Sequence, residues 1–218
     1  MSKIAVVLSG CGVYDGAEIN ESVLTLLALE AENHEFQCFA PNIQQMHVVN
    51  HLTGETEENE TRNVLVEAAR IARGNIKDLK DLSTDEYDAI LFPGGFGAAK
   101  NLSNFATAGA DLSIDPTVES VAKSFAAAGK PAGYMCIAPA MLAKIYGSGV
   151  QCTIGNADDV AGAIKTMGGE HITCDVNNIV VDEAKKVVTT PAYMLANRIS
   201  EAASGINKLV AQISAWTR

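Results

Sequence analysis

The sequence lacks long hydrophobic runs: no stretch approaches the roughly 18 consecutive apolar residues that a bilayer-spanning helix needs. The amino terminus, residues 1–10, also lacks the charged leader and small-residue cleavage site of a secretory precursor, and it runs straight into a strand-like pattern. We therefore expect a cytoplasmic protein with no membrane partner.

Basic residues are scarce as well, with 16 Lys and Arg against 26 Asp and Glu, for a net charge of -10. A surface of this sign repels phosphate backbones and anionic membranes. The balance therefore predicts that nucleic acid is not a partner.

The cysteines lack any Cys-x-x-Cys pair, and their number, five, is odd. Such a set indicates neither a disulfide framework nor a structural metal, and nothing in the sequence calls for a cofactor. In a reducing compartment most of these thiols are expected to behave as small buried hydrophobes. A reactive thiol must then be distinguished by its surroundings.

What is present is enough apolar sequence for one domain: 218 residues, of which 48% are hydrophobic and 19% charged, with no linker. We predict a single domain over residues 1–218. Short β-branched or apolar runs alternate with longer helical patterns, which is typical of a parallel sheet covered on both faces. The expected fold class is α/β.

Strands and helices can be assigned from this alternation, whereas residues 42–60 predict only an irregular excursion with a turn. The expected strands are 4–8, 36–40, 87–92, 152–154, a short strand near Ile172, and a hairpin that pairs 179–181 with 187–189. One helix is expected to begin near residue 18, and four others are expected over 61–73, 116–129, 157–167 and 192–216.

Cys136 stands where residues 130–144 change from an apolar run to a helical pattern with almost no loop. A side chain on such a turn is held outward at the carboxyl edge of the sheet. The start of the following helix would stabilise a thiolate and lower the thiol pKa from about 8.5 into the range of about 3.5 to 7.5. Cys136 is thus a candidate nucleophile, although its spacing alone favours a small buried side chain beneath the helix.

Two other groups could serve such a nucleophile. Gly94 and Gly95 follow a buried strand and leave backbone N–H groups open for an oxyanion, although the same pair could form an ordinary tight turn. Glu18 and Glu21 share one side of a first helical turn, where one could transfer protons or both could simply be solvated acids that suit the helix dipole.

These signals converge in a resemblance that extends along nearly the whole chain. The sequence resembles the PfpI-type branch of the class I glutamine amidotransferase-like superfamily, and most closely the ElbB-type glyoxalase family. The stretches that carry the resemblance are LSGCGVYDGAE (8–18), NHLTGE (50–55), PGGFGAAKNL (93–102) and MCIAPA (135–140).

The resemblance implies a flavodoxin-like three-layer sandwich with a mainly parallel sheet and a small β-hairpin. It also implies that Cys136 is the nucleophile, that Gly94, Gly95 and the N–H of Ile137 form the oxyanion and substrate site, and that Glu21 is the acidic partner. Glu18 stays the alternative acid. A homodimer is implied too, while the family's link to isoprenoid biosynthesis does not identify a substrate.

The sequence departs from the superfamily's hydrolase pattern because Ile137 stands where protease-like members have a histidine. A histidine-dependent triad is therefore in doubt. Of the four histidines, His171 is expected in a core or surface role, while His47 and His51 could line the site from the excursion.

The function implied is that of a cofactor-independent glyoxalase III-like hydro-lyase, in which Cys136 and Glu21 convert small α-oxoaldehydes to 2-hydroxy acids through a hemithioacetal. The near negative charge of a thiolate is expected to keep Glu21 partly protonated. Three alternatives stay open: a deglycase or cysteine hydrolase of glycated substrates, a redox-sensing interaction protein, and, least favoured, a glutamine amidotransferase subunit.

Overall fold

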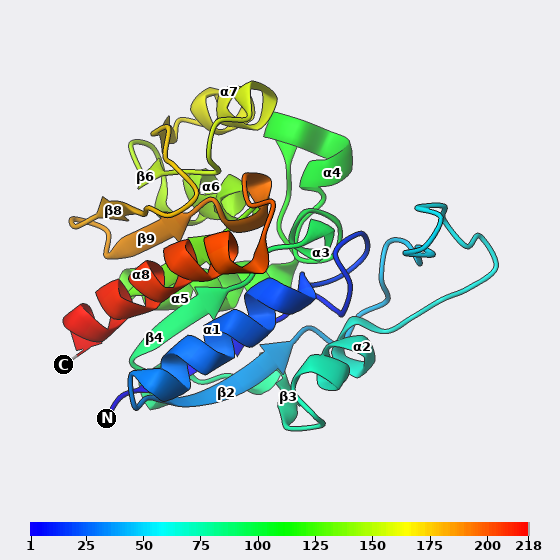
Figure 1. Ribbon diagram of the computed structural model, residues 1–218, viewed down its shortest axis with the longest axis horizontal. Helices are drawn as coiled ribbons and strands as arrows, with labels where there is room; N and C mark the ends of the chain where they lie inside the picture. Colours follow the sequence, from blue (N-terminus) through cyan, green and yellow to red (C-terminus); the bar gives the residue numbers. More distant parts are fainter. Residues whose placement is uncertain (218) are drawn as a thin grey trace.

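A mainly parallel sheet forms the middle of three layers in the computed structural model, which describes residues 1–217 (Figure 1). Within those residues the sheet has seven strands in the order β3-β2-β1-β4-β5-β9-β8, and only β8 runs antiparallel to its neighbour. The strands are β1 (Lys3–Val7), β2 (Glu35–Ala40), β3 (Ile76–Asp78), β4 (Ala89–Phe92), β5 (Ala132–Met135), β8 (Val180–Asp182) and β9 (Val187–Thr190). The expected flavodoxin-like α/β fold and its hairpin are confirmed.

Helices cover both faces of this sheet. The helix α1 (Ile19–Ala31) packs beside α8 (Ile199–Thr217) on one face, and α5 (Pro116–Ala127) lies on the other (Figure 1). Pro116 opens α5, where the sequence predicts a helix to begin, and the Asp115 side chain caps it. The remaining helices are α2 (Val64–Ile71), α3 (Phe96–Lys100), α4 (Phe105–Ala108), α6 (Leu142–Tyr146) and α7 (Asp158–Thr166), and a small separate sheet pairs β6 (Gln151–Cys152) with β7 (Glu170–His171).

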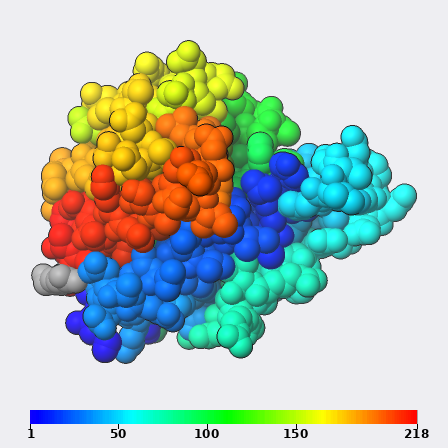
Figure 2. All heavy atoms as spheres, in the orientation of Figure 1, coloured from blue at the N-terminus to red at the C-terminus, as the bar shows by residue number. Residues whose placement is uncertain are grey.

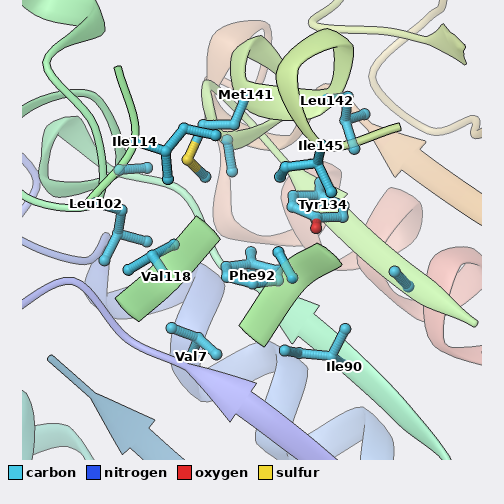
Figure 3. Packing of buried hydrophobic residues seen from close by; sticks show 14 of the residues in the cluster. Val7, Ile90, Phe92, Leu102, Ile114, Val118, Tyr134, Met141, Leu142 and Ile145 are labelled. Carbon is cyan, nitrogen blue, oxygen red and sulfur yellow. The ribbon is translucent and has the colours of Figure 1, made fainter. Parts of the chain in front are cut away.

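Alternating strand residues supply two separate hydrophobic cores, one beneath each helical layer. On the α5 side, Phe92 at the end of β4 stacks on Tyr134 of β5, with ring centroids 4.5 Å apart and planes within 7° (Figure 3). Both rings are fully buried. Their stacking holds the carboxyl ends of two adjacent strands, so it fixes the loops that leave those ends.

Two sequence expectations need correction in the carboxy-terminal quarter and near residue 76. The closing helix begins at Ile199 rather than at residue 192, because Pro191 is followed by the short 3₁₀ helix η5 (Ala192–Met194). The edge strand β3 was not expected, since three residues are too few to show a strand period. No helix within residues 1–217 is long and apolar enough to cross a membrane.

Residues 42–60 form an irregular arm, as expected, which projects from the body of the molecule (Figure 2, cyan). An isolated antiparallel bridge between Gln44 and Asn63 closes its base. Asp15, in the loop after β1, accepts the Val49 N–H at 2.7 Å. The arm is therefore attached to the loop that leads into α1.

Candidate active site

The loops after β1, β4, β5 and β9 meet at one edge of the sheet. The chain passes from β1 outward to β2 and β3 and then returns to β4 on the other side of β1. That reversal leaves a crevice at the carboxyl ends of β1 and β4, the place where open α/β sheets bind ligands. The loops after β4 and β5 carry the predicted glycines and Cys136, and the loop after β1 leads into α1, which carries Glu21.

Cys136 occupies the turn between β5 and the 3₁₀ helix η4 (Ala138–Met141). Its φ of 59° lies in the left-handed region, which is rare for a residue other than glycine. Its backbone N–H still belongs to the sheet and donates to the Thr190 carbonyl at 3.1 Å. The turn thus aims the side chain out of the sheet, and the predicted strand-to-helix elbow is present.

Gly94 lies directly against the cysteine. A Cβ atom at position 94 would be 2.3 Å from the Cys136 Cβ, 3.0 Å from its Sγ and 2.7 Å from the Glu21 Oε2. Gly95 has a φ of 92°, and a Cβ there would meet the backbone N of Glu18 at 2.4 Å. Both positions therefore require glycine. Gly94 is needed for the close approach of its neighbours, and Gly95 is needed both for a close approach and for its left-handed backbone conformation.

Glu21 lies in the first turn of α1, and its side chain is completely buried. Its Oε2 accepts the Gly94 N–H at 2.8 Å and its Oε1 accepts the Tyr193 N–H at 3.1 Å. Its carboxyl is also within hydrogen-bonding reach of the Cys136 thiol. The structure therefore brings Glu21, Gly94 and Cys136 together, but the Gly94 N–H that was expected to bind an oxyanion is bonded to Glu21 instead.

Glu18 has a different position. It is the N-cap of α1, and its Oε2 accepts the Glu21 N–H at 2.6 Å. Burial raises the pKa of the Glu18 carboxyl, against the backbone hydrogen bonds that it accepts. Of the two candidate acids, it is Glu21 that faces the sulfur, while Glu18 holds the start of the helix that carries it.

The two central groups share an environment that disfavours charge. Burial raises the pKa of the Glu21 carboxyl to about 7, and the negative charge of Glu18 acts in the same direction. Burial, and then the Glu21 charge, raise the pKa of the Cys136 thiol well above its usual range. The pKa of Glu21 is raised as expected, but the expected cause is wrong: burial is the main cause, and the hydrogen bond with the Cys136 thiol lowers the pKa.

The expectation of an acidic thiol at this turn is wrong. Backbone N–H groups of Gly95 and Ile137 do hydrogen-bond the sulfur and favour its thiolate. They do not offset the burial of a sulfur atom that lies beside a carboxyl group. In the resting site the thiol keeps its proton, and Glu21 is the group placed to receive it.

A cavity of about 480 Å³ opens outward from the sulfur. Cys136 is 8% exposed, and it reaches this space together with Gly95 and Ile137. The other lining residues are Val13, Phe96, Ala99, Phe105, Ala106, Ala157, Asp159, Val160, Tyr193 and Met194. A substrate in the cavity would meet the thiol and the two N–H groups at one end.

Histidine is not brought to this cavity by any part of residues 1–217. His51 lies on the arm, where its Nε2 accepts the Tyr14 N–H at 3.2 Å and is 3.9 Å from the Asp15 Oδ1. His171 is in β7, with its Nε2 accepting the Ile154 N–H at 3.3 Å. Neither lines the cavity, and His34 and His47 do not line it either.

Tyr193 lines the cavity and also holds Glu21 through its N–H, and no sequence pattern pointed to it. It was assigned to the closing helix, whereas Ala192, with a φ of 45°, turns the chain into the site. The signal that could have revealed the turn is Pro191 directly after the β9 strand.

The next feature of the site is its set of possible metal ligands. Across residues 1–217, no three His, Cys, Asp or Glu side chains are grouped in a way that could hold a metal ion. What the arrangement offers is a thiol, a carboxyl with a pKa near neutrality, and backbone N–H groups.

The close approach at Gly94 predicts a large effect of one methyl group. Gly94→Ala is expected to abolish the contact between Glu21 and the sulfur and to lower the free energy of unfolding by about 1–3 kcal/mol. Chemical denaturation and alkylation of Cys136 would measure both effects. The matched control is Gly162→Ala on α7, where a Cβ meets nothing within 4 Å and about 0.5–1 kcal/mol of stabilisation is expected. Equal effects of the two substitutions would contradict this account.

Comparison with known proteins shows relatives whose similarity extends over nearly the full chain. The human glutamine amidotransferase-like class 1 domain-containing protein 3, mitochondrial, is 47% identical over 97% of this chain and 82% of its own length. The zebrafish ES1 protein, mitochondrial, is 37% identical over 88% of this chain and 77% of its own. No family model matches the sequence.

Solved structures agree with the fold. An isoprenoid biosynthesis protein with an amidotransferase-like domain from Ehrlichia chaffeensis superimposes with a TM-score of 0.93, at 37% identity over 100% of both chains. Glyoxalase III from Candida albicans superimposes with a TM-score of 0.62, at 14% identity over 97% of both chains. At that identity the second match shows a common fold only.

The relatives correct the expected location. The human, rat and zebrafish proteins are all named as mitochondrial, which overturns the cytoplasmic assignment. The physical reason for the error is that hydropathy and net charge bear on solubility and on non-specific binding rather than on the compartment.

Proposed function

The chain belongs to the glutamine amidotransferase-like class 1 domain family, and from that premise we propose that it is a cofactor-independent glyoxalase of the ElbB type. It would convert glyoxal to glycolate and methylglyoxal to lactate. The observation that carries the proposal is the contact between the Cys136 thiol and the buried Glu21 carboxyl at the end of a cavity. The fold shared with a glyoxalase III supports it.

The first step is addition of the thiol to the aldehyde. Cys136 Sγ forms a bond to the aldehyde carbon while Glu21 takes the thiol proton, so no free thiolate has to exist beforehand. The carbonyl π electrons move to oxygen, which would be stabilised by the N–H groups of Gly95 and Ile137, the two that contact the sulfur in the resting site. Glu21 then passes the proton to that oxygen, and a neutral hemithioacetal results.

The second step moves hydrogen between adjacent carbons. Glu21 removes the proton from the former aldehyde carbon to give an enediolate and returns it to the neighbouring carbon, while the hydroxyl proton of the hemithioacetal passes to the neighbouring oxygen. The first carbon is oxidised by two electrons and the second is reduced by two, so no external oxidant is needed. Water then adds to the resulting thioester, which releases the 2-hydroxy acid and regenerates the thiol.

The pKa of Glu21 suits both directions of this transfer. A group with a pKa of about 7 is present in its acid and base forms in similar amounts at neutral pH. An ordinary glutamate would be almost wholly ionised there and would be a poorer proton donor. Burial of the carboxyl thus supports its use as a shuttle.

The raised thiol pKa also bears on the redox-sensing alternative. Cysteines that sense oxidants are accessible and have a low pKa, because the thiolate is the species that reacts. Cys136 is 8% exposed, and burial raises its pKa. These properties favour an enzyme whose base activates the thiol within the substrate complex.

The deglycase alternative uses the same residues and differs in substrate, so product analysis separates the two. Free glyoxal in amine-free buffer is expected to yield glycolate, measured by proton NMR, in amounts that exceed the enzyme many times over. If glycolate forms only when a glycated thiol or amine is supplied, the deglycase reading replaces the glyoxalase. Ammonia release from glutamine would instead indicate an amidotransferase.

The expectations about partners stay predictions. We propose a small aldehyde as the substrate, without nucleic acid or membrane partners, and a homodimer as the assembly. Analytical ultracentrifugation measures the assembly directly, and a monomeric mass at micromolar concentration would contradict it.

A further inference from the structure

The cavity beside Cys136 is much larger than the smallest α-oxoaldehyde. Its volume is about 480 Å³. Glyoxal has four heavy atoms, and at roughly 30 Å³ for each water-sized group it would occupy about 120 Å³. Most of the space would then be empty or filled with water, whereas binding sites usually enclose most of their ligand.

The wall of the cavity is mainly apolar and comes from four helices and a loop. Phe96 and Ala99 belong to α3, Phe105 and Ala106 to α4, Val160 to α7, and Met194 to η5. The phenylalanines supply flat surfaces, and the alanines leave room between them. A wall of this composition stabilises an apolar substituent by removing it from water.

The charge of the cavity lining disfavours an anionic ligand. Among the described residues that line the cavity there is no Lys or Arg, and the only charged one is Asp159, in the exposed first turn of α7. Lys100 lies outside: its Nζ is 5.4 Å from the centre of the Phe96 ring and donates to the Tyr14 carbonyl at 2.8 Å. A phosphate or carboxylate on the substrate would lose water without gaining a partner.

We infer that the site selects neutral α-oxoaldehydes that carry an aryl or branched alkyl group, in preference to glyoxal and to anionic aldehydes. This inference rests on the proposed function for its reaction. The aldehyde end would lie at Cys136, Gly95 and Ile137, and the apolar group would lie between Phe96, Phe105 and Val160. The product of phenylglyoxal would be mandelate, formed by the same hydrogen transfer.

Turnover of three probes tests the selection: glyoxal, phenylglyoxal and 4-carboxyphenylglyoxal. Each kcat/KM is divided by the rate at which the same aldehyde adds to 2-mercaptoethanol, which removes differences in electrophilicity. We expect phenylglyoxal to exceed glyoxal by about tenfold or more, and the carboxylate to fall about tenfold below phenylglyoxal. Equal corrected values for glyoxal and phenylglyoxal would overturn the inference and leave the glyoxalase proposal standing.

A binding measurement tests the preference of the cavity for neutral apolar groups without any turnover. Acetophenone, which lacks the aldehyde, is expected to slow alkylation of Cys136 by iodoacetamide, whereas benzoate at the same concentration is not. If acetophenone protects but no aldehyde is turned over, the reaction is wrong and the preference of the cavity holds. If neither compound protects, or both protect equally, the preference is wrong.

One pair of variants locates the effect in the cavity. Val160→Trp places an indole in the space and is expected to lower the ratio of phenylglyoxal to glyoxal kcat/KM by about fivefold or more. Val66→Trp is the same substitution on α2, where Val66 is 62% exposed, and is expected to leave the ratio unchanged. Ala106→Leu, at an exposed position on α4, is the milder cavity variant should Val160→Trp fail to fold. An unchanged ratio in both cavity variants would contradict the inference.

Discussion

Replacing Cys136 with serine is expected to lower kcat/KM for glyoxal and methylglyoxal by roughly 10³-fold or more. A serine hydroxyl is a far weaker acid than a thiol, so a carboxyl with a pKa of about 7 is a poor base for it. The side chain is of similar shape and the site is already polar, so the fold should be retained. Steady-state kinetics and thermal unfolding measure the two effects.

Cys11→Ser is the matched control for this substitution. Cys11 is half-buried in the loop after β1 and does not line the cavity, so its loss should leave kcat/KM within about twofold of the wild type. Retained activity in Cys136→Ser would end the proposed mechanism. Lost activity in both variants would show that the effect comes from the fold rather than from the nucleophile.

Glu21→Gln is expected to lower kcat by about 10²- to 10⁴-fold, because the amide can neither take the thiol proton nor return a proton to carbon. In the wild type, Glu21 must be ionised to act as the base. Its pKa is about 7, so kcat/KM should rise as the pH increases through about 7 and level off above it. The variant should lose this rise, and a pH profile from 5 to 9 measures it.

Glu18→Gln separates the two acids. The amide oxygen of glutamine can still accept the Glu21 N–H, so the helix cap should persist. Removing the Glu18 charge removes one cause of the raised Glu21 pKa, so the rise in kcat/KM should move to lower pH with activity retained. If Glu18→Gln abolishes activity and Glu21→Gln does not, the acid has been assigned to the wrong residue.

The α/β fold could be predicted from the sequence because buried parallel strands leave continuous apolar runs, as at Ala89–Phe92, and because α5 carries its own start signals in Asp115 and Pro116. The turn at Cys136 could be predicted for the same local reason. Short elements such as β3 and η5 could not, since their conformation depends on neighbours distant in the chain.

The site could be predicted in its residues but less well in its electrostatics. Cys136, Glu21 and Gly94 follow from local patterns and from the resemblance, and the structure brings them together. The sign of the thiol pKa shift depends on how deeply the sulfur is buried and on the distance to Glu21, which are properties of the folded chain. His51 was expected to be able to line the site, but the folded arm holds it against Tyr14 and outside the cavity.

The two N–H groups that hold Glu21 are far apart in the sequence: Gly94 follows β4, and Tyr193 follows β9, the last strand among the described residues. The carboxyl cannot be fixed until β9 has inserted beside β5 and the turn at Ala192 has formed. A nascent or truncated chain that ends before residue 193 would therefore carry the nucleophile without an ordered base. Competence for catalysis should therefore arise only after β9 and the turn at Ala192 have formed.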